Sequence, residues 1–165
     1  MTFRHILFPV DFSQRSYSAA PQVESLARHY SAKTTLLHVI WHGETAKSTL
    51  TFIPAGQMLA RLAAFTKDRF PSLVAACELV EGEPAQAIVK FAREKGVDLI
   101  MLPSHGYGPF RSLLIGSVTA KVLHIAQCPV WTGAHVESEP QPMHTPFRSV
   151  LCAVDLTPHT GSLME

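Results

Sequence analysis

The sequence has almost no excess of charge of either sign. Its 165 residues include 14 lysines and arginines against 13 aspartates and glutamates, which gives a formal net charge of +1 at pH 7. No block of like charge appears along the chain. Because proteins that bind the phosphate backbone usually show a basic patch, the charge pattern argues against nucleic acid as a partner.

Long apolar runs and paired cysteines are also missing. No apolar stretch approaches the ~20 residues that a membrane-spanning helix needs, and the run near the N-terminus is too short for a signal peptide. The three cysteines, Cys77, Cys128 and Cys152, show no CxxC spacing and fit a reducing compartment better than a disulfide scaffold. These features predict a cytoplasmic protein without a membrane partner.

What the sequence does contain is a regular alternation of short apolar runs and amphipathic helical patterns. Hydrophobic residues make up 47% of the chain, enough for a core, and its length suits one domain with residues to spare. The alternation predicts βαβ units, and right-handed crossovers then give an α/β fold, a parallel sheet with helices on both faces. We expect strands over Ile6–Val10, Thr34–Val39, Ala75–Val80, Val97–Leu102 and Pro129–Trp131.

Helical patterns lie between these runs. Pro21 in the first helix predicts either a start near Ser18 or a kink. Further helices are expected over Gln57–Phe70, from Pro84 to Lys95, and over Val118–Ala126, while Trp41–Ala55 is expected to be a loop. The residues expected on the inner faces are Ala19, Ala20, Val23, Leu26, Ala27, Tyr30, Met58, Leu62, Phe65, Ala85, Ile88, Val89 and Ala92.

The stretch Pro103–Thr119 is the strongest functional signal in the sequence. Gly106 and Gly116 are separated by nine residues, and Ser117 follows at the start of a helical pattern. Free N–H groups at a helix N-terminus attract anions, so this stretch is a candidate phosphate site. No lysine stands directly before Ser117, which excludes a Walker A motif. Asp11 also follows a strand, and ligands of parallel sheets bind beyond the carboxyl ends of the strands.

The C-terminal region contains an internal repeat. Residues 134–146 are polar and proline-rich, and we interpret them as a linker that follows a domain of residues 1–133. Residues 147–157 (FRSVLCAVDLT) match residues 3–13 (FRHILFPVDFS) at five of eleven positions, with Asp155 in the place of Asp11. Residues 147–165 therefore resemble the first strand of a second, incomplete copy, the alternative being chance similarity between two apolar strands.

Together these motifs resemble the universal stress protein family, in its nucleotide-binding and tandem forms. The matching segments are ILFPVDFS at residues 6–13, LLHV at 36–39, GEPAQAI at 82–88, and the run from Ser104 to Val130. The resemblance covers residues 3–133 and implies a five-stranded parallel sheet of order 3-2-1-4-5. It also implies a homodimer formed through the last strand, near Pro129–Trp131, and an adenine nucleotide, ATP with Mg²⁺ or AMP.

The resemblance also implies the residues of a nucleotide site. In the family motif G-x-x-G-x9-G-[ST], this chain keeps Gly106, Gly116 and Ser117 but has Pro103 in place of the first glycine. Asp11 would contact the ribose or adenine end, and Val39 would contact adenine through its backbone. The remaining expected contacts, mainly with phosphates, are Pro103, His105, Gly106, Gly116, Ser117, Val118 and Thr119.

Several of these residues have a purely structural alternative. Asp11 or Ser13 could cap the following helix, and Ser117 could be an N-cap. His105 could stabilise its turn and Arg111 could be a solvated surface residue. The pair His38 and His42 has i,i+4 spacing but is not on a helix, which argues against metal binding, and Cys128 fits a small buried hydrophobe.

No catalytic constellation appears in the sequence, so an enzyme is not the favoured interpretation. The leading hypothesis is a stress-response regulatory module that binds an adenine nucleotide and acts through a dimer or partner interface. The alternative is a nucleotide-free dimeric interaction protein of the same family, in which Pro103 closes the pocket. A weak ATPase is a third.

Overall fold

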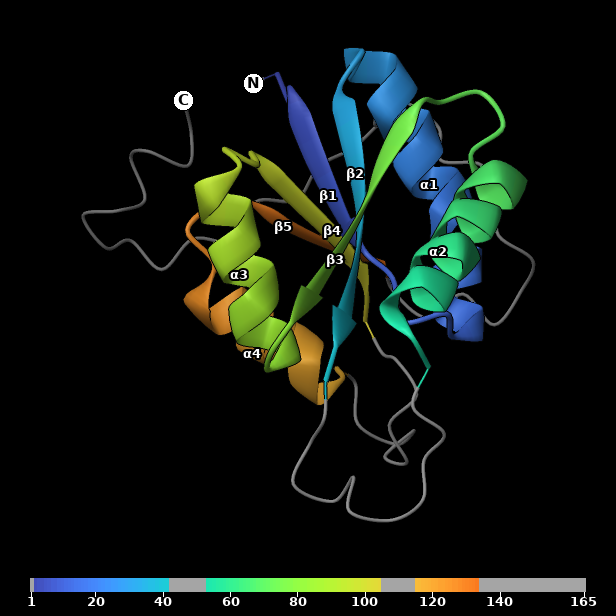
Figure 1. The fold of residues 1–165 in the computed structure, drawn as a ribbon. Coiled ribbons are helices and arrows are strands. Elements are labelled where there is room, and N and C mark those ends of the chain that lie inside the picture. Colours follow the sequence, from blue (N-terminus) through green and yellow to red (C-terminus); the bar gives the residue numbers. More distant parts are fainter. Residues whose placement is uncertain (1, 42–52, 105–114, 134–165) are drawn as a thin grey trace.

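The computed structural model describes residues 2–41, 53–104 and 115–133, and these residues form one parallel sheet between two layers of helices (Figure 1). The strand order is β3-β2-β1-β4-β5, with all neighbours parallel. This confirms the predicted doubly wound α/β fold and its order. The strands are β1 (His5–Pro9), β2 (Lys33–Ile40), β3 (Ala75–Glu81), β4 (Leu99–Pro103) and β5 (Val130–Gly133).

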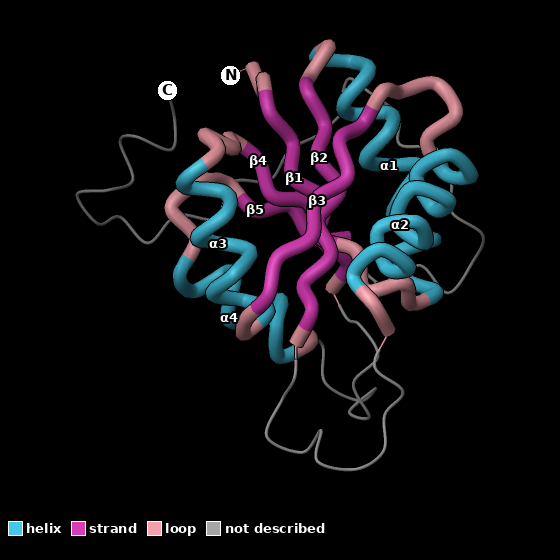
Figure 2. Tube along the Cα trace, in the orientation of Figure 1, coloured by secondary structure: helices cyan, strands magenta, loops and turns pink. Residues whose placement is uncertain are grey.

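Two helices cover each face of the sheet. Helices α1 (Gln14–Tyr30) and α2 (Ala55–Arg69) lie on one side, and α3 (Pro84–Glu94) and α4 (Ser117–Ile125) lie on the other (Figure 2). None of the helices in the described ranges is long and apolar enough to cross a membrane. The predicted linker, residues 134–146, and the predicted repeat, residues 147–165, lie outside the described residues.

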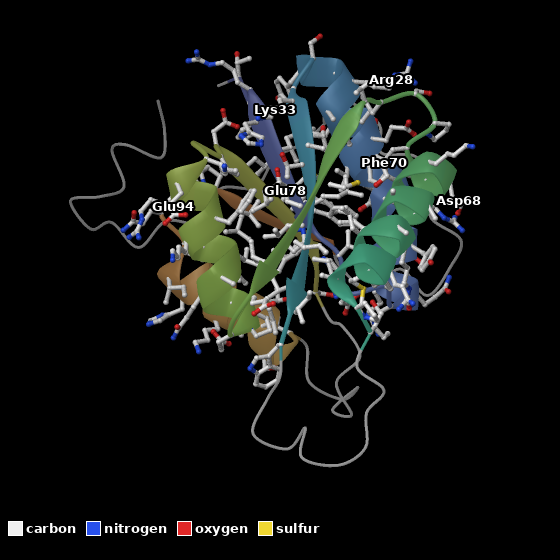
Figure 3. All side chains as sticks on the ribbon, viewed as in Figure 1. Arg28, Lys33, Asp68, Phe70, Glu78 and Glu94 are labelled. Carbon is white, nitrogen blue, oxygen red and sulfur yellow. The ribbon has the colours of Figure 1, made fainter. Side chains whose placement is uncertain are left out.

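Alternating side chains of the central strands fill two separate cores. Ile6 and Phe8 of β1 pack toward α1 and α2, whereas Leu7 between them packs toward α3 and α4. All three are completely buried. Phe70, just after α2, lies between that helix and the sheet with its ring 6.0 Å from Phe8, whereas Asp68 and Glu94 lie on the periphery (Figure 3). Since both faces of the sheet are covered at its centre, β1 and β4 are buried almost along their whole length.

The inner faces of the helices agree with the predicted pattern. Almost every residue predicted to face inward is buried, and Tyr30, Met58 and Val89 pack partly buried against the two cores. Strand ends differ from the prediction by one or two residues. The predicted loop over Trp41–Ala55 is described only at Trp41, Ile53, Pro54 and Ala55, and Ala55 already belongs to α2.

The predicted start of α1 near Ser18 is wrong. The helix begins at Gln14, because Ser13 is a good N-cap whose Oγ accepts a hydrogen bond from the Ser16 N–H at 3.3 Å. Pro21 therefore lies in the helix interior, where it removes the N–H that would donate to the Tyr17 carbonyl. Burial of Ala19, Ala20 and Val23 around it offsets this loss.

Candidate functional site

The described site residues gather at the carboxyl edge of the sheet. Asp11 follows β1, Val39 lies near the end of β2, Pro103 ends β4, and α4 begins beside β4. Parallel strands all end at the same edge, which explains why residues distant in sequence meet there. The predicted site also includes the α4 N-cap, Gly116, and the first three residues of α4, which are Ser117, Val118 and Thr119. His105, Gly106, His42 and Arg111 lie outside the described residues.

Asp11 stabilises the turn at the start of α1 with two hydrogen bonds. Its Oδ1 accepts a hydrogen bond from the Ser13 N–H at 2.9 Å and another from the Ser16 hydroxyl at 2.6 Å. The N-cap itself is Ser13, so the two residues cooperate in the turn rather than compete for one role. Both bonds go to Oδ1, and the half-buried Asp11 keeps the acceptor capacity of Oδ2.

Val39 lies beyond the end of the β1–β2 ladder. The register of these strands ends at Pro9 and Leu37, and the Val10 N–H donates to the Leu37 carbonyl at 2.8 Å. Backbone groups of alternate residues point to the same side of a strand, so the N–H and C=O of Val39 also point toward the β1 side. The backbone of Val39 is therefore directed at the space above Val10, as a backbone contact with a ligand requires.

The N-terminus of α4 is fastened to the end of β4. The Gly116 N–H donates to the Ser104 carbonyl at 2.6 Å, and the Thr119 hydroxyl donates to the Pro103 carbonyl at 2.9 Å. Thr119 is buried by this contact. Its hydroxyl proton is therefore engaged within the protein, which leaves the Thr119 backbone N–H as its contribution to an anion site.

Among the residues that the structure describes, no side chain caps α4. The N-cap is Gly116, whose extended backbone (φ −68°, ψ 152°) places its carbonyl to accept from the Ala120 N–H at 2.8 Å. The suggestion that Ser117 is the N-cap is therefore wrong, because the helix starts one residue earlier and Ser117 is its first residue. The N–H groups of Ser117, Val118 and Thr119 have no partner within the helix and form an electropositive end.

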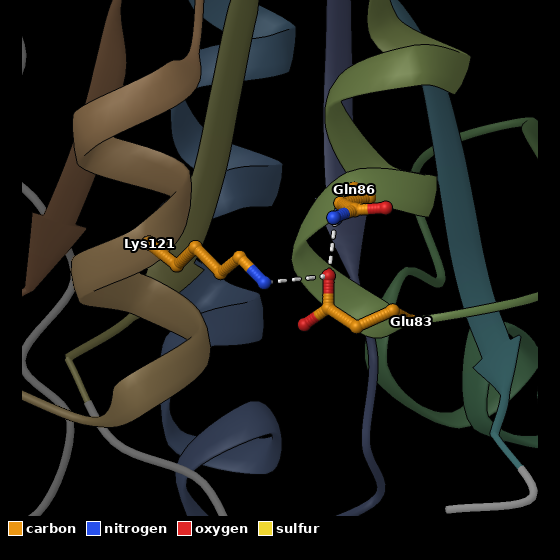
Figure 4. Close-up of polar contacts among 3 residues, drawn as sticks. All are labelled: Glu83, Gln86 and Lys121. Carbon is orange, nitrogen blue, oxygen red and sulfur yellow. Dashed lines mark hydrogen bonds and ion pairs between the residues drawn. The ribbon is translucent and has the colours of Figure 1, made fainter.

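A polar contact holds α4 against α3 (Figure 4). Glu83 is the N-cap of α3, where it accepts from the Gln86 N–H at 3.0 Å, and it also lies 3.2 Å from the Lys121 ammonium of α4. Partial burial alone would raise the pKa of Glu83, but these two partners outweigh it and lower the pKa below its ordinary value. Glu83 is thus ionised at neutral pH and connects the two helices of this face.

A cluster around Phe12 at the same edge was missed by the sequence reasoning. Phe12 is buried and adopts left-handed backbone geometry (φ 60°). The His38 ring lies 4.8 Å from it, and the Arg61 guanidinium lies 4.1 Å above its ring. His38 Nδ1 donates to the Val10 carbonyl at 2.7 Å, since a carbonyl can only accept. The available signal was Phe12 itself, a bulky residue between Asp11 and Ser13 in a turn.

Burial has different consequences for His38 and Cys128. Desolvation is the main reason why the pKa of His38 is lowered, and the neighbouring Arg61 lowers it further. Burial raises the pKa of the Cys128 thiol, consistent with the predicted small hydrophobe rather than a reactive nucleophile. Among the described residues, no group of histidines, cysteines and carboxylates could hold a metal ion, and Cys77 and Cys128 are free thiols.

The fold defines a class of protein, the doubly wound α/β sheet, whose strand order here reverses between β1 and β4. Ligands of this class bind beyond the carboxyl ends of the strands, at such a reversal. The chain belongs to the universal stress protein family, whose family model matches residues 2–132. This family comprises stress-response proteins.

Relatives support this assignment in sequence and structure. Universal stress protein MJ0577 of Methanocaldococcus jannaschii is 27% identical over 150 residues, covering 78% of this chain and 93% of the relative. The solved structure of MJ0577 matches with a TM-score of 0.70 at 28% identity, over 84% of this chain and 100% of the other. The likeness to MJ0577 therefore extends over nearly the whole described domain.

Two further solved structures contain adenine nucleotides. A universal stress protein in complex with cAMP matches with a TM-score of 0.60 at 22% identity, covering 81% of this chain and 98% of that chain. The universal stress protein from Archaeoglobus fulgidus in complex with dAMP matches with a TM-score of 0.54 at 23% identity, covering 80% and 98%. These two likenesses show the shared fold.

Proposed function

We propose that this chain is a regulatory protein that binds an adenine nucleotide at the carboxyl edge of its sheet. The observation that carries the proposal is the N-terminus of α4. Its N–H groups at Ser117, Val118 and Thr119 have no partner in the helix, and no side chain of the described residues caps it. Two hydrogen bonds join it to the end of β4. A preorganised, electropositive helix end of this kind suits a phosphate group.

The other proposed contacts with the nucleotide also lie at the carboxyl edge of the sheet. Val39 directs its backbone polar groups beyond the end of β1, where they suit an adenine, and Asp11 Oδ2 suits a ribose hydroxyl. The complexes of two neighbours with cAMP and dAMP support an adenine nucleotide as the ligand class. In this proposal ATP or AMP is the ligand, and Mg²⁺ accompanies the phosphates of ATP because it prefers oxygen ligands and retained water.

Binding acts by differential affinity rather than by chemistry. A nucleotide that binds one state of a dimer or partner interface more tightly shifts the population toward that state. Two other hypotheses lead to different results with the same protein. A nucleotide-free interaction protein carries no nucleotide and gives no binding heat, whereas a weak ATPase releases phosphate slowly when ATP and Mg²⁺ are supplied.

Calorimetric titration with ATP and AMP, together with the nucleotide content of the denatured protein, tests the proposal. The decisive variant is Ser117→Asp, which places a negative charge on the first residue of α4. We expect the affinity for ATP to fall by about tenfold or more, while an acidic residue in the first turn stabilises the helix. The matched control is Gln57→Asp in the first turn of α2, which also lacks a side-chain cap.

The outcomes separate clearly. Loss of ATP binding in Ser117→Asp, with retained affinity in Gln57→Asp, supports the phosphate assignment. Equal ATP affinity in Ser117→Asp and the unmodified chain contradicts it. Absence of bound nucleotide and of binding heat at millimolar ATP would overturn the proposal and favour the nucleotide-free interaction protein.

We further propose a homodimer formed through β5, in a cytoplasmic protein. Support for the dimer comes from the place of β5 at the edge of the sheet, with β4 on one side. The free thiols of Cys77 and Cys128 suit a reducing compartment. We also retain the proposal that residues 1–133 are one domain, residues 134–146 a linker, and residues 147–165 the start of a second copy in a tandem arrangement.

A further inference from the structure

The ladder between β1 and β4 stops before either strand ends. Its register runs through Ile6–Leu99 and Leu7–Ile100, although β1 continues to Pro9 and β4 continues to Pro103. By contrast, β1 pairs with β2 up to Pro9, and β4 pairs with β5 up to Pro103. The interruption is therefore specific to the junction where the strand order reverses.

Backbone direction explains the interruption. The Val10 N–H donates to β2, so the backbone groups of Pro9, one residue earlier, point the other way, toward β4. The Ile100 N–H donates to the Pro129 carbonyl beside β5, so the backbone groups of Pro103, three residues later, point toward β1. Pro9 and Pro103 therefore face one another across the junction. A regular parallel ladder would continue with the N–H of residue 9 donating to the Met101 carbonyl. The N–H of residue 103 would then donate to the Pro9 carbonyl. Proline has no N–H, so two successive rungs are missing.

Within β1 and β4 as the structure describes them, the junction consequently presents acceptors and lacks the two backbone donors of these rungs. The carbonyls of Pro9 and Met101 lose their ladder donors, and Met101 is completely buried. The Pro103 carbonyl is already engaged by Thr119. Asp11, two residues after Pro9, adds the acceptor Oδ2. Since buried carbonyls are nearly always paired, this edge favours a ligand group that brings hydrogen-bond donors.

We propose that the facing prolines Pro9 and Pro103 make the β1–β4 junction a selector for a ligand with free ribose hydroxyls. The inference rests on the proposed nucleotide site and specifies the sugar that it accepts. A ribose diol offers two O–H donors, whereas a phosphate or a carbonyl group brings only acceptors and would face the Pro9 carbonyl and Asp11 unfavourably. Pro103, which replaces the family glycine, is thus a specificity-determining residue of this chain.

The test compares ATP, 2′-deoxy-ATP and 3′-deoxy-ATP by calorimetric titration of the full chain and of Pro103→Ala. In the unmodified chain we expect at least one deoxy analogue to bind about fivefold more weakly than ATP, the worth of one net hydrogen bond. Pro103→Ala supplies an N–H that pairs with the Pro9 carbonyl. We therefore expect the preference for ATP over that analogue to fall to about one.

Pro71→Ala is the matched control, because Pro71 is exposed and lies in the turn between α2 and β3. It should keep the fivefold preference. If Pro103→Ala does not fold, Pro103→Gly supplies the same N–H to the Pro9 carbonyl and should reduce the preference in the same way. Equal binding of all three nucleotides by the unmodified chain, or an unchanged preference in a folded variant of Pro103, overturns this inference alone. No binding of any nucleotide overturns the proposed function and the inference with it.

Discussion

Phe12 has a backbone conformation that is unusual for a residue other than glycine. Its φ of 60° lies in the left-handed region, where a Cβ costs about 1–2 kcal/mol. The ring compensates for this cost through its contacts with His38, Arg61 and Phe65, whose ring lies 6.1 Å away. The turn that carries Asp11 therefore depends on a strained residue held by its neighbours.

Because of this strain, we expect glycine at position 12 to give a more stable protein than alanine, the reverse of the order at most positions. Phe12→Ala loses the ring and keeps the strain, whereas Phe12→Gly loses the ring and relieves the strain. We expect Phe12→Gly to be about 1 kcal/mol more stable than Phe12→Ala in urea unfolding. At Val74, an exposed residue without positive φ, Gly should be no more stable than Ala. An Ala variant as stable as the Gly variant at position 12 would contradict the argument.

His5 is a buried histidine at the amino edge of the sheet. Its Nδ1 donates to the Lys95 carbonyl at 3.2 Å, so Nε2 accepts from the Thr35 hydroxyl at 2.9 Å in the neutral ring. Desolvation is the main reason why the pKa of His5 is lowered, and nearby Lys33 lowers it further. The fold therefore prefers the neutral ring.

The lowered pKa of His5 predicts a loss of stability in mild acid. The neutral ring contributes its full stability above the ordinary histidine pKa of about 6.5, and this contribution is lost as the pH falls toward the lower folded value. We expect the stability difference between pH 7.5 and pH 5.0 to be smaller in His5→Gln than in the unmodified chain. Urea midpoints at the two pH values measure this. His29→Gln, on the surface of α1, controls for the loss of an imidazole.

At the level of elements, one side chain both caps a helix and joins two helices. Glu83 is about one-third exposed and Lys121 nearly half exposed, so water and salt weaken their ion pair. The hydrogen bond from the Gln86 N–H to Glu83 fills a position at the start of α3 that is otherwise unpaired. The cap should therefore matter more than the charge pair.

We expect Glu83→Ala to destabilise the protein by about 1 kcal/mol and Lys121→Met by less than about 0.5 kcal/mol. Urea unfolding at low and high salt measures both. Only the small effect of Lys121→Met should shrink further in 1 M NaCl. Equal losses in the two variants would show that the ion pair, rather than the cap, carries the stability.

The elements were largely predictable because each buried strand is a short apolar run and each helix buries a periodic face. What sequence patterns did not give was local geometry at the ends of elements. The capping strength of Ser13 outweighed the presence of Pro21 and set the start of α1. The left-handed turn at Phe12 depends on contacts with β2 and α2, which no local pattern encodes. Likewise, the opposition of Pro9 and Pro103 follows from register between distant strands.

At the scale of the whole molecule, the proposed homodimer depends on the outer side of β5. The Pro129 carbonyl accepts from the Ile100 N–H and therefore points toward β4. Because backbone direction alternates along a strand, the backbone groups of Val130 and Thr132 point away from β4. The edge strand can thus pair with another strand without disturbing its own sheet. This side of the strand is the surface expected for the proposed homodimer.

We expect Thr132→Pro to convert the dimer into a folded monomer, because proline removes an outward N–H and leaves the β4 rungs intact. Sedimentation measures the mass, and circular dichroism checks the fold. Thr132→Val keeps the N–H and should remain dimeric. A monomeric unmodified chain at micromolar concentration, or a dimeric Thr132→Pro variant, would contradict assembly through β5.

The short β1–β4 ladder also affects how the folded molecule opens. Backbone pairing joins β1 to β2 over the whole of β1, whereas the β1–β4 ladder covers Ile6 and Leu7, with one more bond from the Asp98 N–H to the His5 carbonyl. Toward its carboxyl edge the centre of the sheet therefore lacks backbone hydrogen bonds and is held by side-chain packing. We expect sub-global opening to separate a β1–β2–β3 unit from a β4–β5 unit. In native-state hydrogen exchange, the two units would then exchange as separate cooperative blocks. A ligand that bridges the centre would fuse them into one.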